Sequence, residues 1–117
     1  MVSVQRMKRS IERGGKKFLD RVFTCSEQSY CEPKRMKYEH YAARMAAKEA
    51  VIKILNQSSK AACSYKEIEI LKKPTGKPWI QLNAALEKKL KLPKKYQLEI
   101  SMSHERKYAI ANAVLVI

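Results

Sequence analysis

The stretch from residue 37 to residue 55 constrains the fold of this chain more than any other segment. It contains no glycine and no proline, and it is rich in alanine, the strongest helix former. We therefore predict a long helix there, with Asn56 as its C-terminal stop. The small alanine side chains would let other elements approach this helix closely, which makes it the expected centre of the fold.

The N-terminal part of the chain also has helical periodicity. One face is apolar, and a second, basic stripe runs beside it, formed by Arg6, Arg9, Arg13 and Lys17. The pair Gly14-Gly15 should weaken or end this helix, because glycine costs a helix about 1 kcal/mol relative to alanine. Thr24 and Glu27 have the spacing of a capping box, which predicts a short second helix that ends near Pro33.

The second half of the chain alternates with period two, as half-buried strands do. Strands are expected over residues 66–70, 79–82, 97–103 and 108–117, with a turn at 73–78 and a short helix after Asn83. Helices followed by an antiparallel meander indicate an α+β fold. The length of 117 residues fits a single domain spanning residues 1–117.

The charge balance restricts the possible partners. Twenty-five Lys and Arg against eleven Asp and Glu give a formal net charge of +14, which attracts anions such as nucleic acid, acidic proteins, anionic membranes and polyphosphates. We expect no membrane association, because no segment approaches the roughly 20 apolar residues of a span. Nucleic acid is disfavoured because the few aromatic residues do not alternate with Lys or Arg. Three cysteines without metal-site spacing suggest reduced thiols in a cytoplasmic protein.

Four segments resemble one family when their order and spacing are considered together. The most specific is Arg44-Met-Ala-Ala-Lys-Glu-Ala-Val-Ile-Lys53, and the others are residues 18–24, Gly76-Lys77-Pro78 and Ser101-Met-Ser-His-Glu105. This arrangement is similar to the holo-acyl-carrier-protein synthase group of phosphopantetheinyl transferases. The resemblance covers nearly the whole chain, so it implies that family's fold, an antiparallel sheet packed on a long central helix.

The resemblance also implies a reaction. Enzymes of this group transfer 4′-phosphopantetheine from coenzyme A to a serine of apo-acyl carrier protein, and the second product is adenosine 3′,5′-bisphosphate. The group uses Mg²⁺ and forms homotrimers with coenzyme A bound between subunits. A cytoplasmic role in fatty acid biosynthesis would follow.

Two features of this sequence depart from the family pattern. Family members begin with a short apolar strand that ends in a metal-binding aspartate, and the alignment puts that aspartate immediately before Met1. We therefore expect the first strand to be missing, through a misassigned start, a truncated gene or a genuine loss. In place of a glycine-rich phosphate loop the chain has residues 56–60, where Ser58, Ser59 and Lys60 could donate hydrogen bonds. A weakly active or inactive relative that only binds coenzyme A or carrier protein is the alternative reading.

The resemblance makes Glu49 the metal ligand and a catalytic residue. Read without the motif, Glu49 would be a surface residue paired with Lys53 four positions later. Lys53, on the same helix face, could neutralise the pyrophosphate and orient the leaving group. The proton of the carrier serine would go to Glu49 or to a metal-bound hydroxide.

Other basic residues are candidates for binding coenzyme A. The set is Arg44, Lys48, Lys53, Lys77 and His104, although a solvated helix face, turn chemistry or a hairpin cap would also explain its members. His40 is interpreted as an exposed helix residue. The stripe formed by Arg6, Arg9 and Arg13 is expected to dock the acidic acyl carrier protein, because complementary charge steers association.

Overall fold

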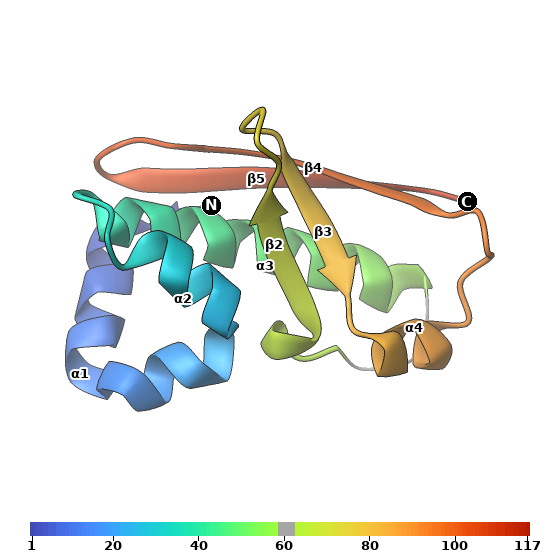
Figure 1. The fold of residues 1–117 in the computed structure, drawn as a ribbon, viewed down its shortest axis with the longest axis horizontal. Coiled ribbons are helices and arrows are strands. Elements are labelled where there is room, and N and C mark those ends of the chain that lie inside the picture. Colours follow the sequence, from blue (N-terminus) through green and yellow to red (C-terminus); the bar gives the residue numbers. More distant parts are fainter. Residues whose placement is uncertain (59–62) are drawn as a thin grey trace.

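A single long helix forms the centre of the molecule. The computed structural model describes residues 1–58 and 63–117, and in it α3 (Lys37–Ser58) lies along a ribbon of two long antiparallel strands. These strands are β4 (Gln97–His104) and β5 (Tyr108–Val116), and both pack on α3 (Figure 1). The predicted α+β architecture is thus confirmed.

The helix predicted over residues 37–55 is also confirmed, but its predicted stop is wrong. Asn56 lies inside α3, which continues to Ser58. Small alanine side chains allow neighbouring elements to pack close to the α3 axis, as expected. The buried alanines of this helix are Ala42, Ala43, Ala46 and Ala47. None of the described helices is both long enough and apolar enough to cross a membrane.

The strands form two sheets, so the predicted single meander is wrong. The first sheet has the order β1-β5-β4, and the second is the hairpin of β2 (Ile68–Lys72) and β3 (Pro78–Leu82). This hairpin crosses α3 (Figure 1). β3 packs near β4 without a hydrogen-bonded ladder, and α4 (Ala84–Leu90) lies between the two strands in the chain.

The first strand is short but present among the described residues. β1 (Val2–Ser3) pairs with β5 through Val2 opposite Ala109 and Ser3 opposite Tyr108. The apolar strand that was expected to be missing would precede Met1, so β1 leaves that expectation untested. The backbone N–H of Val4 continues the link by donating to the carbonyl of Lys107.

The helix α1 (Val4–Val22) is kinked rather than ended by its two glycines. Gly15 has φ 56° and ψ −143°, a left-handed conformation that favours glycine, and helical structure resumes after it. A Cβ on Gly14 would lie 2.6 Å from the Cβ of Phe18. Both glycines are thus required for the bend that turns the second half of α1.

Caps and turns mark the remaining boundaries. The capping box predicted at Thr24 is confirmed, and it starts α2 (Cys25–Cys31). Asn83 caps α4 by accepting from the N–H of Ala85. The strand predicted over residues 66–70 begins only at Ile68, because Tyr65–Glu67 forms a 3₁₀ turn that is itself capped at Ser64.

A fully buried ion pair lies where these elements meet. The Lys48 ammonium is 2.5 Å from Glu27 Oε1, and neither side chain is exposed to solvent. Lys48 also donates to the carbonyls of Val22 (2.7 Å) and Tyr65 (3.0 Å). Burial lowers the pKa of Lys48, whereas the Glu27 carboxylate favours the charged ammonium.

The carboxylate of Glu27 is saturated as completely as its partner. It accepts from the backbone N–H of Ile70 through Oε2 and from that of Thr24 through Oε1, both at 2.8 Å. The pair therefore connects the end of α1, the start of α2, the middle of α3 and β2. A buried pair with every polar atom bonded is costly to break, although it was also costly to desolvate.

Removing one member of this pair should destabilise the protein strongly. We expect Lys48→Ala to lower the free energy of unfolding by about 3–5 kcal/mol, because Glu27 is left buried and uncompensated. Urea unfolding followed by circular dichroism measures the change. The matched control is Lys77→Ala, since the Lys77–Glu99 pair is exposed and 3.8 Å long, and its loss should cost less than about 1 kcal/mol. Equal losses in the two variants would contradict a special role for the buried pair.

Candidate functional site

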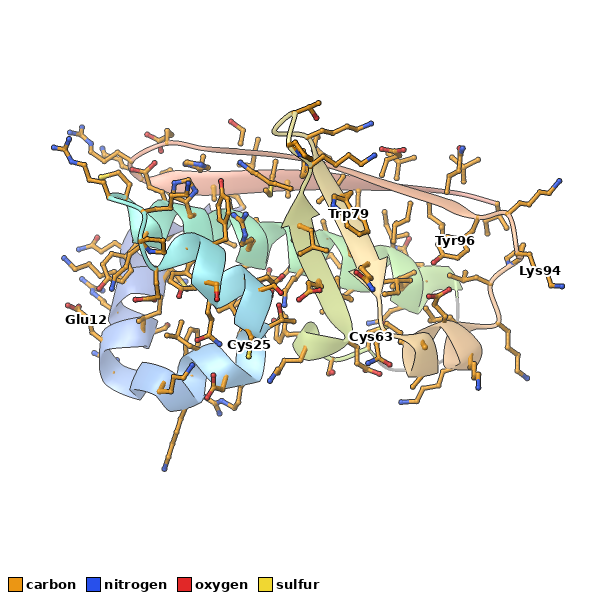
Figure 2. The ribbon with its side chains drawn as sticks, viewed as in Figure 1. Glu12, Cys25, Cys63, Trp79, Lys94 and Tyr96 are labelled. Carbon is orange, nitrogen blue, oxygen red and sulfur yellow. The ribbon has the colours of Figure 1, made fainter. Side chains whose placement is uncertain are left out.

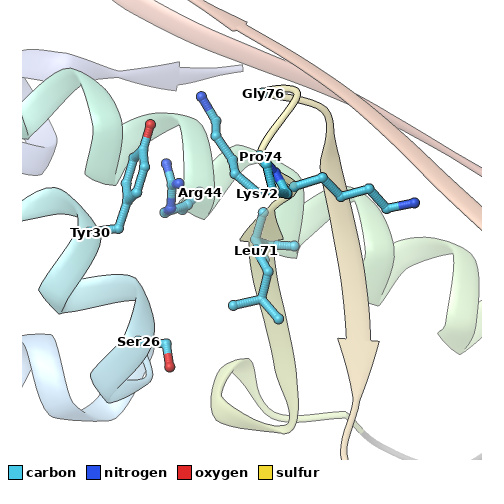
Figure 3. A pocket seen from close by; sticks show the side chains of 9 residues that line it. Ser26, Tyr30, Arg44, Leu71, Lys72, Pro74 and Gly76 are labelled. Atoms are coloured by element: carbon cyan, nitrogen blue, oxygen red, sulfur yellow. The ribbon is translucent and has the colours of Figure 1, made fainter.

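Two adjoining hollows form a basic cleft on one face of the molecule. The larger, of about 540 Å³, lies between α2, α3 and the β2–β3 turn, and its lining is drawn in Figure 3. The smaller, of about 300 Å³, extends toward the end of β4. They share three lining residues, which are Arg44, Lys72 and Gly76. We call the two together the Arg44 cleft.

The central cation of this cleft is buried and incompletely bonded. Arg44 is only 1% exposed, and its guanidinium lies 4.0 Å from the centre of the Tyr30 ring. One guanidinium nitrogen donates to the carbonyl of His40 over a long 3.5 Å, and the buried Nε has no hydrogen-bond partner within residues 1–58 and 63–117. No carboxylate among the described residues forms an ion pair with Arg44. A buried cation in this state is expected to need an anion that the chain itself does not supply.

More positive charge surrounds the ring of Tyr30. The ammonium of Lys34 lies 4.5 Å and that of Lys72 5.4 Å from the ring centre. Burial alone would raise the pKa of the Tyr30 phenol, but a hydrogen bond with Lys72 and the charges of Arg44 and Lys34 lower it below its usual value. The lowered pKa shows that the electrostatic potential in the cleft favours negative charge.

Two histidines lie at the other end of the cleft. His104, at the end of β4, lines the smaller hollow, and its Nδ1 is 3.0 Å from Oε1 of Glu39 on α3. The ring of His40 is 4.8 Å from that of His104 and 5.7 Å from that of Tyr30, in edge-on contacts. The expectation that His40 would be exposed is wrong, since its Nδ1 is buried and has no hydrogen-bond partner among the residues that the structure describes.

The two remaining cleft candidates from the sequence lie outside this arrangement. Lys48 was expected to bind the coenzyme, but its ammonium is fully buried in the ion pair with Glu27, so it has no donor left for a ligand. Lys77 is exposed and lies beside Glu99, although its neighbours Gly76 and Pro78 line the smaller hollow. The one-turn spacing put Lys48 on the same helix face as Arg44, but it could not reveal the partner carboxylate.

Glu49 and Lys53 lie on a different face of α3. A helix turns by 100° per residue, so Glu49 points about 140° away from Arg44. Glu49 is half-buried near Tyr65, and Lys53 is exposed. Burial, and secondarily the charge of Glu49, raise the pKa of Tyr65. The residues predicted for one active site are thus divided between two faces within one chain.

A Mg²⁺ site requires oxygen ligands, which carboxylate side chains can supply. Within residues 1–58 and 63–117, no three His, Cys, Asp or Glu side chains come together as a metal site. Mg²⁺, however, is commonly held by one or two carboxylates together with substrate phosphates and water. The half-buried Glu49 carboxylate fits such a role as a single protein ligand. The side chains of Ser58, Ser59 and Lys60, expected to contact phosphate, lie outside the described part of the structure.

The basic stripe of α1 is exposed as expected. Arg6, Arg9 and Arg13 all face solvent, on the side of the helix opposite its buried residues. Figure 2 shows the side chains over the whole molecule, with Glu12 labelled on the same helix.

Several cleft residues were missed by sequence reasoning. Tyr30 and Lys72 line the cleft, and Glu39 contacts His104; the three come from three elements, and nothing in their local sequence separates them from ordinary surface residues. Lys72 carried the best available signal, because it directly precedes the turn that contains Gly76-Lys77-Pro78.

Comparisons with known proteins identify what this arrangement is similar to. Residues 1–113 match the family model described as "4'-phosphopantetheinyl transferase superfamily". A holo-[acyl-carrier-protein] synthase of Ruminiclostridium cellulolyticum is 42% identical, over 98% of this chain and 87% of that protein. One of Protochlamydia amoebophila is 40% identical, over 97% and 91%.

Solved structures give the same result for the fold. The holo-[acyl-carrier-protein] synthase of Helicobacter pylori in complex with coenzyme A matches with a TM-score of 0.82 and 31% identity, over 98% of this chain and 95% of that one. The enzyme of Neisseria meningitidis matches with a TM-score of 0.84 and 28% identity, over 99% and 93%.

The environment of His40 predicts how stability depends on pH. Burial, followed by the charge of His104, lowers the pKa of His40 from 6.5 to about 4. Between these values the unfolded chain binds a proton at His40 that the folded chain does not, so stability falls as the pH drops from 6.5 toward 4. We expect His40→Gln to lose less stability than wild type between pH 7.5 and pH 5, measured by urea unfolding. Identical losses would contradict the buried, neutral state of His40.

Proposed function

The chain belongs to the 4′-phosphopantetheinyl transferase superfamily, and we propose that it transfers 4′-phosphopantetheine from coenzyme A to a serine of apo-acyl carrier protein. The products are holo-carrier protein and adenosine 3′,5′-bisphosphate. The observation that carries this proposal is the buried, unpaired Arg44 in a basic cleft. Coenzyme A carries a pyrophosphate and a 3′-phosphate, and these anions could compensate the positive charge of the cleft.

The cleft residues have distinct roles in binding the coenzyme. Arg44 presents a planar guanidinium, which suits bidentate recognition of phosphate oxygens, and Tyr30 holds it in place by stacking. Lys72 adds a mobile point charge from β2. His104 donates to a phosphate oxygen when its ring is protonated. Support comes from the Helicobacter pylori relative, whose structure contains coenzyme A.

The metal ligand and the catalytic residues are proposed on the other face of α3. Glu49 is the protein ligand for Mg²⁺, which would neutralise charge on the pyrophosphate oxygens when bound. Lys53, one turn later, neutralises the leaving phosphate. Glu49 is also our candidate for accepting the proton that the serine hydroxyl loses on attack.

The division of these residues between two faces supports an assembly of several subunits. Residues that one chain holds about 140° apart on α3 can meet around one ligand if neighbouring chains each supply one face. β5 offers a surface for such contacts, since apolar side chains alternate along its exposed face at Tyr108, Ile110, Val114 and Val116. We propose a homotrimer with active sites between subunits.

The carrier protein is proposed to dock on α1. The exposed guanidinium groups of Arg6, Arg9 and Arg13 form a positive stripe, and the net charge of +14 extends the same field over the whole protein. An acidic carrier protein would be steered to this stripe and oriented by it. A cytoplasmic role in fatty acid biosynthesis completes the proposal.

Transfer can be measured directly by the mass that an apo-acyl carrier protein gains when incubated with the chain, coenzyme A and MgCl₂. We expect wild type to give the phosphopantetheinylated carrier, and EDTA to stop the reaction. Glu49→Ala should be at least about a hundredfold slower, because charge neutralisation by a metal is worth several kcal/mol. The matched control is Glu87→Gln on α4, an exposed carboxylate that should keep the wild-type rate.

Calorimetry with coenzyme A distinguishes an active transferase from a relative that only binds the coenzyme. Wild-type binding without any mass gain would overturn the transferase proposal in favour of a relative that only binds. An unchanged rate in Glu49→Ala would remove that residue from the site.

A further inference from the structure

The carboxylate of Glu39, which was not among the predicted site residues, forms a hydrogen bond with His104, which was. Glu39 lies in the first turn of α3, and His104 ends β4, 65 residues later in the chain. Oε1 of Glu39 and Nδ1 of His104 are 3.0 Å apart, and the two side chains are only 13% and 28% exposed. This contact is the only hydrogen bond that the described structure gives to either side chain. Among the described residues, no other hydrogen bond competes with this contact for either side chain.

The surroundings restrict the histidine ring further. The ring of His40 packs edge-on against it at 4.8 Å, and His104 also lines the smaller hollow together with Arg44 and Lys72. The titratable and charged groups around this pair of histidines are Glu39, His104, Arg44, Lys72, Lys34 and Tyr30. Glu39 is the one carboxylate among them.

We propose that Glu39 is a positioning residue, which fixes the ring of His104 and keeps a proton on its Nδ1, so that Nε2 is the nitrogen that faces the bound phosphates. This inference rests on the proposed function for the role of the ligand, but the hydrogen bond itself does not. A carboxylate accepts and cannot donate, so the contact requires Nδ1 to carry the proton in both charge states of the ring. The proton that His104 gains or loses is then always the one on Nε2.

This arrangement explains why a weakly buried histidine can serve a phosphate site. With Nδ1–H held by Glu39, the neutral ring presents only a lone pair at Nε2, so His104 donates to a phosphate oxygen only when the ring is protonated. An unrestrained imidazole would also rotate and exchange its two tautomers. Holding the ring by its far nitrogen removes that freedom before the ligand binds, in the way that a second carboxylate orients a metal-binding histidine. His40 adds a flat, neutral wall, since its pKa is lowered to about 4 and it brings no second charge at neutral pH.

The tautomer can be observed without any substrate. Long-range ¹H–¹⁵N spectra of the full chain should show His104 with its proton on Nδ1 above the pH at which the ring titrates. Glu39→Ala should shift the proton partly or wholly to Nε2, whereas Glu39→Gln should retain the wild-type pattern, because its amide oxygen can still accept. A wild-type pattern in Glu39→Ala, or proton on Nε2 in wild type, would overturn the proposal.

Kinetics test whether the positioning matters for the reaction. We expect Glu39→Ala to lower kcat/KM for coenzyme A by about tenfold, mainly through KM, as loss of an orienting carboxylate typically does. The double variant with His104→Ala should be no worse than His104→Ala alone, since Glu39 acts only through that ring. Losses that multiply would overturn the proposal, and Glu87→Gln again serves as the matched control. If wild type shows no transfer, the proposed function fails while the tautomer result still decides the role of Glu39.

Discussion

The buried ion pair between Lys48 and Glu27 is the interaction on which the geometry of the cleft depends. Two charges that are fully removed from water must keep all their hydrogen bonds, so the four backbone groups bonded to them cannot move independently. Each wall of the Arg44 cleft begins close to this pair. Arg44 lies one turn before Lys48 on α3, Tyr30 lies three residues after Glu27 on α2, and Lys72 lies two residues after Ile70 on β2.

This coupling connects stability to binding. Arg44 is a buried cation without a carboxylate partner in the described part of the chain, and such a group would tend to draw the elements around it apart or admit water. The saturated pair one turn away holds α2 and β2 against α3 in spite of that cost. Within the described residues, the chain thus combines one compensated buried charge with one buried charge that no carboxylate compensates.

Sequence patterns predicted the elements well where the signal was local. Alanine content and the absence of glycine and proline predicted α3, and the Thr24–Glu27 spacing predicted the start of α2. The family motif directed attention to Arg44 and His104, and both line the cleft. Contacts between distant segments were not predictable in the same way. Arg44 and Lys48 look alike in sequence, and the distant Glu27 makes Lys48 a structural cation. The contact between Glu39 and His104 spans 65 residues and left no local signal.

A crystal structure of the chain with coenzyme A bound would test the central claim most directly. The account predicts a phosphate oxygen within hydrogen-bond distance of the Arg44 guanidinium, with the Lys48–Glu27 pair intact and Tyr30 still stacked on Arg44. Coenzyme A bound with all its phosphates away from Arg44 would contradict the account, because the buried guanidinium would then remain unpaired even when the ligand is present.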